Sequence, residues 1–233
     1  MHHIILSHTM NTPTYHNNIE QGTDAWLAIR NGILTASEIK LIMTPTRKPA
    51  NNDKSRAHIW EIAAQRISGH TEPRFITDDM IRGHNDEILA RDLYSEKYAT
   101  VTECGFITRL IGGVTFGYSP DGLVGDDGLI EIKSRRQRYQ VETIMSGQVP
   151  AEYMAQIQTG LMVTGRAWLD FISYSAGLPM FVSRVYPDLE YQAAITEAAI
   201  EFDEAVEAII DTYNVEAEKY HPTERTNTEL EII

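Results

Sequence analysis

The sequence predicts a single α/β (α+β) domain in which helices flank a central mixed β-sheet. Apolar residues recur at helical spacing up to about residue 98. From about residue 100 the pattern changes to short segments rich in β-branched and aromatic residues, separated by glycines. After these segments, apolar residues recur at helical spacing in two more stretches, and two further strand-like segments lie between those stretches. Helices on both sides of a run of strands are typical of a sheet that helices cover.

Two short helices are expected within residues 21–43. Gly32 ends the first helix, and Thr35 with Glu38 forms a capping box for the second. Residues 44–53 contain two prolines, two asparagines and a pair of basic residues, which predicts a mobile basic loop.

Two longer helices follow, over about 54–68, ended by Gly69, and over about 78–98. The second has apolar residues at helical spacing, namely Ile81, Ile88, Leu89, Leu93 and Tyr94. The next strands are expected at 100–103, 106–110, 114–118 and 129–132, and we interpret them as an antiparallel meander. The last elements are expected to be a helix at 151–163, strands at 167–173 and 180–185, and an acidic helix at 189–213.

The length of 233 residues fits one domain (1–233), with a core at 19–213, an N-terminal arm at 1–18 and an acidic tail at 214–233. Apolar stretches are shorter than the ~18 residues of a membrane span, and the start lacks a signal-peptide pattern. The single cysteine, Cys104, excludes an internal disulfide, a cysteine zinc site and an iron–sulfur cluster. We therefore expect a protein of the bacterial cytoplasm, with no membrane partner.

The net charge of −13 would by itself argue against nucleic-acid binding. From Tyr186 to the end, however, there are 13 acidic and two basic residues, so the rest of the chain is almost neutral. Local clusters then dominate the field, because screening acts over about 10 Å. The densest basic cluster consists of Lys133, Arg135, Arg136 and Arg138, which could equally be a solvated turn.

The segment 117–138 carries the most informative chemistry. Asp121 follows a proline at the end of a strand, and Glu131 and Lys133 flank Ile132 in the next strand. Residues two apart in a strand share a face, and the Gly-Asp-Asp-Gly turn returns the chain beside Asp121. Two carboxylates suit Mg²⁺ or Mn²⁺, and a lysine can orient the metal-bound water, or deprotonate it when burial lowers the lysine pKa. Phosphodiester hydrolysis is the expected reaction.

An acid-x-Lys triplet alone is weak, because this composition should produce about one by chance. A second triplet, Glu38-Ile39-Lys40, lies in a predicted helix without a preceding Pro-Asp, and we interpret it as a decoy. The alternative for the first triplet is a surface ion-pair cluster.

Four sequence blocks between Ile19 and Tyr213 have a familiar order: IEQGTDAWLAIRNGILTASEIK, RGHNDEILARDLY, SPDG with EIK, and YMAQIQTGLMVTGRAW. Together they resemble the phage-type alkaline exonucleases, the lambda exonuclease and YqaJ viral recombinase group of the PD-(D/E)xK nuclease superfamily. The resemblance implies that superfamily's core, a central mixed β-sheet flanked by helices.

The resemblance also implies roles for residues around the triplet. Asp121, Glu131 and the Ile132 carbonyl match the metal ligands, and Lys133 matches the residue that positions or activates the attacking water. Two further residues match the site: Glu87, at a second metal or in its outer shell, and Gln156, which lines it. Two Mg²⁺ ions are expected.

The resemblance further implies DNA contacts. The pocket for the 5′-phosphate matches Arg30, Ser37 and Ser119, whose guanidinium and hydroxyl groups suit phosphate oxygens. Four more candidates for DNA contact are Arg47, Met80 as an apolar wedge, Arg135 and Arg136.

The function implied is a Mg²⁺-dependent 5′-to-3′ exonuclease of double-stranded DNA. It would release 5′-mononucleotides from a 5′-phosphorylated end and leave a 3′ single-stranded overhang for phage or prophage recombination by strand annealing. By family analogy it forms a homotrimeric ring and works with a single-strand annealing recombinase. The alternatives are a structure-specific endonuclease or resolvase of the same superfamily, and a non-catalytic DNA-end-binding module.

Overall fold

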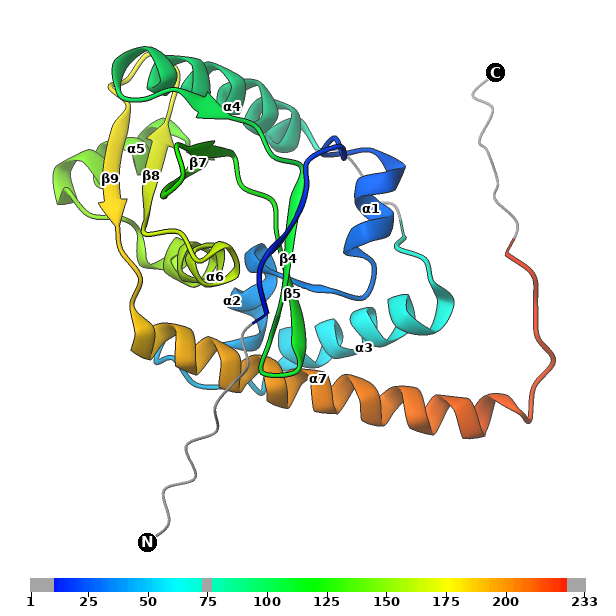
Figure 1. Ribbon diagram of the computed structural model, residues 1–233. Helices are drawn as coiled ribbons and strands as arrows, with labels where there is room; N and C mark the ends of the chain where they lie inside the picture. The colour runs from blue at the N-terminus through cyan, green and yellow to red at the C-terminus, as the bar shows by residue number, and fades with distance from the viewer. Residues whose placement is uncertain (1–10, 73–76, 226–233) are drawn as a thin grey trace, which may run out of the picture.

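The computed structural model describes residues 11–72 and 77–225, whose strands form two mixed sheets (Figure 1). The four-stranded sheet has the order β1-β4-β5-β2, and only its β2–β5 pair is parallel. Its strands are β1 (Thr14–His16), β4 (Phe106–Ile111), β5 (Val114–Tyr118) and β2 (Leu34–Thr35).

The five-stranded sheet has the order β3-β6-β7-β8-β9, and only its central β7–β8 pair is parallel. Its strands are β3 (Val101–Thr102), β6 (Gly122–Val124), β7 (Gly128–Ser134), β8 (Trp168–Tyr174) and β9 (Phe181–Val185). The helices are α1 (Asp24–Arg30), the 3-10 turn η1 (Ala36–Glu38), α2 (Ile39–Ile42), α3 (Asp53–Ser68), α4 (Asp78–Lys97), α5 (Gln137–Ser146), η2 (Ala151–Tyr153), α6 (Met154–Thr164) and α7 (Leu189–Ala217).

Helix α6 joins the two sheets. It contacts β4 and β5 of the first sheet and β8 of the second, so almost all of its side chains are buried. The helix approaches β5 closely at Gly160, where an added Cβ would lie 2.7 Å from the ring of Tyr118. Glycine is therefore required there, because any side chain would displace the helix from the sheet.

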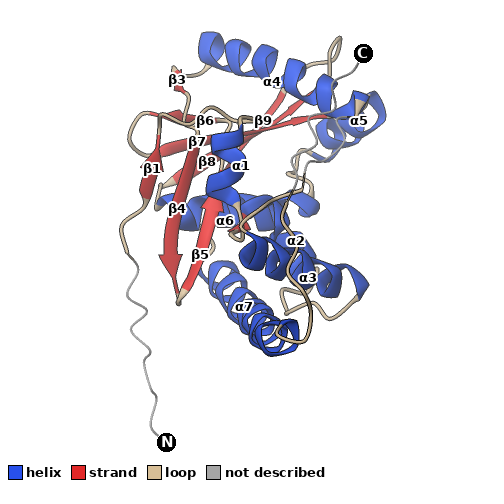
Figure 2. Cartoon of the chain, turned by 90° about the vertical axis from the view of Figure 1, so that its right-hand side faces the viewer, coloured by secondary structure: helices blue, strands red, loops and turns tan. Residues whose placement is uncertain are grey.

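Helices α4 and α7 lie at opposite ends of the molecule, with the sheets between them (Figure 2). Helix α4 packs on β7 and β8 through Ala90 and Tyr94, which meet Ile130, Ile132 and Ile172 in a small core cluster. Helix α7 runs beside α3 and contributes to the larger core cluster, which extends into both sheets.

The predicted fold class is confirmed, and so are the helices that local signals mark. Thr35 and Glu38 form the capping box, and Gly32 and Gly69 have φ of 68° and 63° at the ends of α1 and α3. Within the described residues no helix is long and apolar enough to cross a membrane.

The expected antiparallel meander is wrong. Strands β4 and β5 pair with each other, whereas β3 and β7 belong to the other sheet and pair with β6. The sequence pattern also missed β1, β2, β6 and α5, because the three strands have only two or three residues each and α5 begins in the basic cluster. Short strands have too few residues for an alternating pattern to be recognised.

The apolar spacing of α4 does not identify its buried face. Ile81, Ile88 and Leu89 are exposed, at 53%, 43% and 53% of their surface. Tyr94, from the same apolar set, does face the sheet together with Ala90, and Asp86 is buried one turn before Ala90. Helix α4 therefore presents apolar side chains to solvent beside the site described next.

Candidate active site

The hairpin of β6 and β7 positions Asp121. Gly125 has a φ of 53° in the turn that joins the two strands, and Gly122 pairs with Ile130. Just before β6, the Asp121 Oδ2 atom accepts a hydrogen bond of 2.5 Å from the Ile132 backbone N–H. The turn therefore brings Asp121 back beside β7, as the sequence predicts.

Glu131 is the centre of a buried hydrogen-bond cluster. Its Oε1 atom accepts bonds from Lys133 Nζ at 2.6 Å and from Gln156 Nε2 at 2.5 Å. Its Oε2 atom accepts a bond of 2.8 Å from the Tyr118 hydroxyl. Glu131 is only 1% exposed, so the alternative of a surface ion-pair cluster does not fit. The sequence did not single out Tyr118, since a tyrosine in a strand is an ordinary core residue.

Glu87 approaches the same site from α4. Its carboxylate forms an ion pair with Arg91, one turn later on the helix. The Arg91 Nε atom donates a bond of 2.9 Å to the backbone carbonyl of Asp121, and Arg91 Nη1 lies 3.1 Å from Glu103 Oε1. Arg91 therefore connects the helical carboxylate to the segment that carries Asp121.

Burial and neighbouring carboxylates raise the pKa of Asp121 and of Glu87. Burial and the charges of Glu131 and Glu87 raise the pKa of Asp121 well above its ordinary value, although Lys133 and the Ile132 N–H oppose the shift. Burial and Glu131 also raise the pKa of Glu87, while Arg91 and His84 lower it. For both groups burial is the largest cause of the raised pKa, and repulsion from Glu131 adds to it.

The expectation that burial lowers the pKa of Lys133 is wrong for this arrangement. Burial does act in that direction, but the carboxylates of Glu131 and Asp121 outweigh it and raise the Lys133 pKa above its ordinary value. The Lys133 side chain is accordingly an ammonium that donates to Glu131.

The donor chemistry of this cluster fits a hard divalent cation. Carboxylate oxygens and a backbone carbonyl are ligands that Mg²⁺ prefers, and a cation would relieve the repulsion that raises the pKa of Asp121. In the part of the chain that the structure describes, no three side chains of His, Cys, Asp or Glu converge as a ready-made metal site. The protein would therefore supply few ligands and leave the rest to water, as Mg²⁺ sites commonly do.

Trp26 and Thr35, for which the sequence predicted no role in phosphate binding, link the three residues predicted to bind the 5′-phosphate. Trp26 Nε1 donates a bond of 3.0 Å to Ser119 Oγ, and the Arg30 guanidinium lies 4.1 Å from the centre of the Trp26 ring. Arg30 Nη2 also lies 3.5 Å from Thr35 Oγ1, which is 3.3 Å from Ser37 Oγ. The result is a cationic and hydroxyl-rich group of side chains from α1, β2, η1 and the residue that follows β5.

One cavity of about 880 Å³ extends from Trp26, which contacts Arg30 and Ser119, to the carboxylates of Glu87 and Asp121. Trp26, Met80, Glu87, Arg91 and Asp121 all contribute to its lining. Met80 is 52% exposed on the first turn of α4. A bound group could thus contact Trp26 and the carboxylates of Glu87 and Asp121 at the same time.

The basic cluster is not a free cationic patch. Each of its four members pairs with a carboxylate: Lys133 with Glu131, Arg135 with Glu152, Arg136 with Asp79, and Arg138 with Glu142. The Arg135 side chain is 9% exposed and also donates to the Tyr153 hydroxyl at 2.5 Å, whereas Arg136 is 66% exposed. A direct DNA contact is therefore sterically open to Arg136 but not to Arg135 in this conformation.

Arg47 lies apart from the cavity. It has a φ of 61°, pairs with Asp188 at 3.1 Å and lies 4.3 Å from the centre of the Tyr191 ring. The predicted basic loop is thus tied to the start of α7, and a DNA contact by Arg47 remains a prediction.

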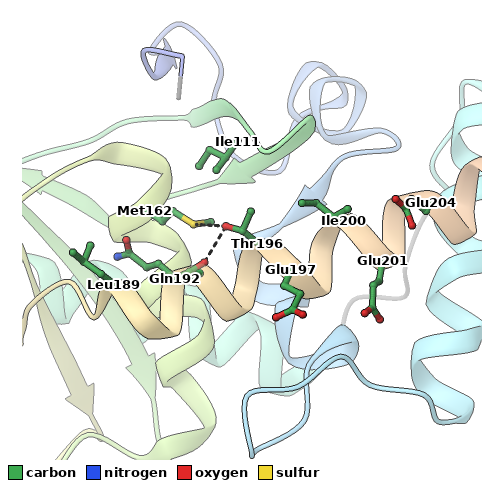
Figure 3. Close-up of a pocket in the computed structure, with 10 residues that line it drawn as sticks. Ile111, Met162, Leu189, Gln192, Thr196, Glu197, Ile200, Glu201 and Glu204 are labelled. Atoms are coloured by element: carbon green, nitrogen blue, oxygen red, sulfur yellow. Dashed lines mark hydrogen bonds between the residues drawn. The ribbon is translucent and has the colours of Figure 1, made fainter. Parts of the chain in front are cut away.

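A second cavity, of about 630 Å³, lies along α7 (Figure 3). Ile111, Met162 and Ile200 form part of its apolar lining, and Thr196 Oγ1 donates to Met162 Sδ at 3.6 Å. Glu197 and Glu201 line it as well. None of the residues that the sequence singled out contributes to this cavity.

The raised pKa of Asp121 predicts that Asp121→Asn stabilises the protein in the absence of metal. An acid whose pKa is higher in the folded than in the unfolded state contributes stability at low pH, and this is lost as the pH rises. The variant should therefore gain free energy of unfolding at pH 7 and lose that advantage below about pH 4, the ordinary range of aspartate. Urea unfolding in EDTA at both pH values measures this. Equal stability of the two proteins at pH 7 would contradict it.

Comparison with known proteins gives consistent matches. Residues 25–167 match the model of the YqaJ-like viral recombinase domain. The crystal structure of an alkaline exonuclease from Laribacter hongkongensis is 37% identical, with a TM-score of 0.74, over 84% of this chain and 99% of that one. The structure of that exonuclease with dAMP is 36% identical, with the same TM-score and coverage. A phage-related exonuclease from Haemophilus somnus 129PT has 14% identity, covers 77% and 96% of the two chains, and shares the fold with a TM-score of 0.55. No match was found among curated proteins.

Proposed function

The chain belongs to the YqaJ-like viral recombinase family, and from this premise we propose that it is a Mg²⁺-dependent 5′-to-3′ exonuclease of double-stranded DNA. Membership makes it a nuclease that hydrolyses DNA phosphodiester bonds. The observation that carries the finer proposal is that Arg30 lies over Trp26, and Trp26 lines the same cavity as Glu87 and Asp121. A pocket for a terminal phosphate beside a hydrolytic site selects DNA ends over internal positions.

The proposed roles follow from the contacts in the cluster. Asp121, Glu131 and the Ile132 carbonyl would hold the ion, with Glu87 at a second ion or its water shell. The bound metal would lower the pKa of a water and neutralise charge on the scissile phosphate. Gln156 and Tyr118 hold the Glu131 carboxylate in one orientation through their bonds of 2.5 and 2.8 Å.

Lys133 would act as a hydrogen-bond donor in the reaction. Its ammonium is 2.6 Å from Glu131 Oε1 and half-buried, so it can orient the attacking water or a phosphate oxygen at the same site. The positive charge that Glu131 and Asp121 maintain on Lys133 suits the stabilisation of negative charge that develops on the phosphate.

At the DNA end, Arg30 would bind the 5′-phosphate together with the hydroxyls of Ser119 and Ser37. A guanidinium binds phosphate oxygens in a planar, two-pronged geometry, and the Trp26 ring beneath Arg30 limits its motion. Met80 is exposed and lines the cavity, which suits an apolar wedge between the last base pairs.

Assembly and partners are part of the same proposal. We expect a homotrimeric ring that encloses duplex DNA, in the bacterial cytoplasm, with a single-strand annealing recombinase as partner in phage or prophage recombination. The acidic residues from Tyr186 onward would keep DNA away from the outer surface of such a ring.

The first experiment compares digestion of linear duplex DNA with 5′-phosphate and 5′-hydroxyl ends in Mg²⁺, beside a covalently closed circle. We expect loss of the phosphorylated strand as mononucleotides, an intact circle, and a trimer by light scattering. Cleavage of the circle would instead favour the endonuclease, and binding without cleavage the DNA-end-binding module. Monomer alone would contradict the ring.

Arg30→Ala should remove the preference for the 5′-phosphate. The rate on phosphorylated ends is expected to fall about 10- to 100-fold, since a hydrogen bond to a charged group contributes about 1.5–3 kcal/mol. The rate on hydroxyl ends should change little. Arg56→Ala is the control, because Arg56 is an exposed arginine of α3 that pairs with Asp53. An unchanged preference in Arg30→Ala would exclude this pocket as the phosphate site.

A further inference from the structure

We propose that Arg91 is a positioning residue that fixes Glu87 and Asp121 relative to each other, and that Mg²⁺ affinity depends on it. The inference rests on the proposed function. Arg91 is not one of the acidic, lysine or glutamine residues that have a role in the proposed chemistry.

The side chain of Arg91 joins three segments of the chain. Its Nε atom donates to the Asp121 carbonyl at 2.9 Å, Nη2 pairs with the Glu87 carboxylate, and Nη1 lies 3.1 Å from Glu103 Oε1. All three guanidinium nitrogens therefore have a partner, and these partners lie on α4, on the segment before β6 and on the segment after β3. The Arg91 side chain is 16% exposed and lines the cavity of the site.

These contacts are needed because Glu87 and Asp121 lie on elements with no continuous backbone pairing between them. Helix α4 packs on the sheet through Ala90 and Tyr94, while its neighbouring Ile88 and Leu89 are exposed. Two hydrogen bonds also attach this stripe to the sheet, from Ser134 Oγ to Asp86 Oδ2 at 2.5 Å and from the Tyr94 hydroxyl to Asp170 Oδ2 at 2.7 Å, but neither involves the Glu87 side chain. A guanidinium bonded at once to the Asp121 backbone and the Glu87 side chain does determine how far apart the two carboxylates lie.

Lysine cannot reproduce this arrangement. It keeps the positive charge, but its single ammonium at the end of a flexible stem cannot span three acceptors in one plane. Arg91→Lys therefore separates the geometric role of Arg91 from its charge. Residues that orient metal ligands without touching the metal typically change metal affinity 10- to 100-fold when they are substituted.

The chain contains a closely matched control in Arg66. Its Nε atom donates to the Gly32 carbonyl at 2.9 Å, and its two terminal nitrogens pair with Asp203 and Glu207 at 2.6 Å each. Arg66 thus has the same pattern of one carbonyl and two carboxylates, at 24% exposure, between α3 and α7. Arg66→Lys should cost similar stability without touching the candidate active site.

The test is calorimetric titration of Mg²⁺ into wild-type protein, Arg91→Lys and Arg66→Lys, without DNA, with thermal unfolding in EDTA for each. We expect Arg91→Lys to bind Mg²⁺ about 10- to 100-fold more weakly, and Arg66→Lys to bind within twofold of wild type. The Mg²⁺ concentration for half-maximal DNA digestion should rise in parallel for Arg91→Lys alone. Both variants should unfold at similar temperatures.

Normal Mg²⁺ affinity in folded Arg91→Lys would overturn the inference and leave the proposed function standing. An equal loss of affinity in Arg66→Lys would also overturn it, because the effect would then be one of general stability. If wild type takes up no Mg²⁺, both the inference and the proposed metal dependence fail.

Discussion

Lys133→Ala is expected to slow DNA hydrolysis by about 10²- to 10⁴-fold, the range for loss of a positioned proton-transfer or donor group. Lys133 Nζ lies 2.6 Å from Glu131 Oε1, and its ammonium is held charged by Glu131 and Asp121. Alanine leaves those carboxylates in place but removes the donor that we propose acts on the attacking water or a phosphate oxygen. Single-turnover digestion of 5′-phosphorylated duplex DNA at saturating Mg²⁺ measures the loss directly.

The Lys133→Ala protein is expected to fold and to bind Mg²⁺. Removing a cation beside two carboxylates favours the bound divalent ion, so Mg²⁺ affinity is expected to stay equal or increase. Lys97→Ala is the matched control, because Lys97 is an exposed lysine at the end of α4 that pairs with Glu96. A Lys133→Ala enzyme within tenfold of the wild-type rate would remove Lys133 from the chemistry.

Phe171→Ala is expected to destabilise the fold by about 3–5 kcal/mol, the usual range for a large aromatic removed from a core. Phe171 is 0% exposed in the centre of β8 and stacks on Tyr153 with ring centres 5.4 Å apart. It also lies opposite Glu131 in the parallel β7–β8 register. At about 2–4 °C per kcal/mol for a chain of this size, the midpoint of thermal unfolding should fall by roughly 10 °C.

Urea and thermal unfolding of wild type and variant measure this loss. Phe171→Leu should be less destabilising, because leucine retains most of the buried apolar volume. Trp60→Ala serves as the control for an exposed aromatic, since Trp60 is 63% exposed on α3. A Phe171→Ala protein as stable as the Trp60→Ala protein would show that β8 does not form the core described here.

Signals that act over a few residues could be interpreted from the sequence alone. The Thr35–Glu38 capping box, the left-handed glycines 32 and 69 and the turn before β7 each occur where their local pattern predicts them. The pairing of Glu131 with Lys133 on one face of a strand follows from the same local geometry. These features depend on backbone conformation and side-chain period, which neighbouring residues determine.

The partition of the strands into two sheets could not be predicted in this way. Strand β5 ends at Tyr118 and β6 begins at Gly122, yet they belong to different sheets, because the chain crosses from one sheet to the other at Asp121. That crossing places Asp121 in the lining of the cavity of about 880 Å³. Which strands pair is decided by contacts between residues distant in sequence, and alternation within a strand carries no information about its partner.

The amino-acid sequence alone predicts the main groups of the proposed chemistry: two acids and a lysine around a strand end, with an arginine and serines proposed to bind phosphate. The residues that support these groups became evident from the folded chain. Trp26 reaches Ser119 across 93 positions, Tyr118 donates to Glu131, and Arg91 contacts the carbonyl of Asp121. The physical reason is that a supporting residue is identified by the partner it contacts, and folding alone brings residues far apart in the chain within hydrogen-bonding distance.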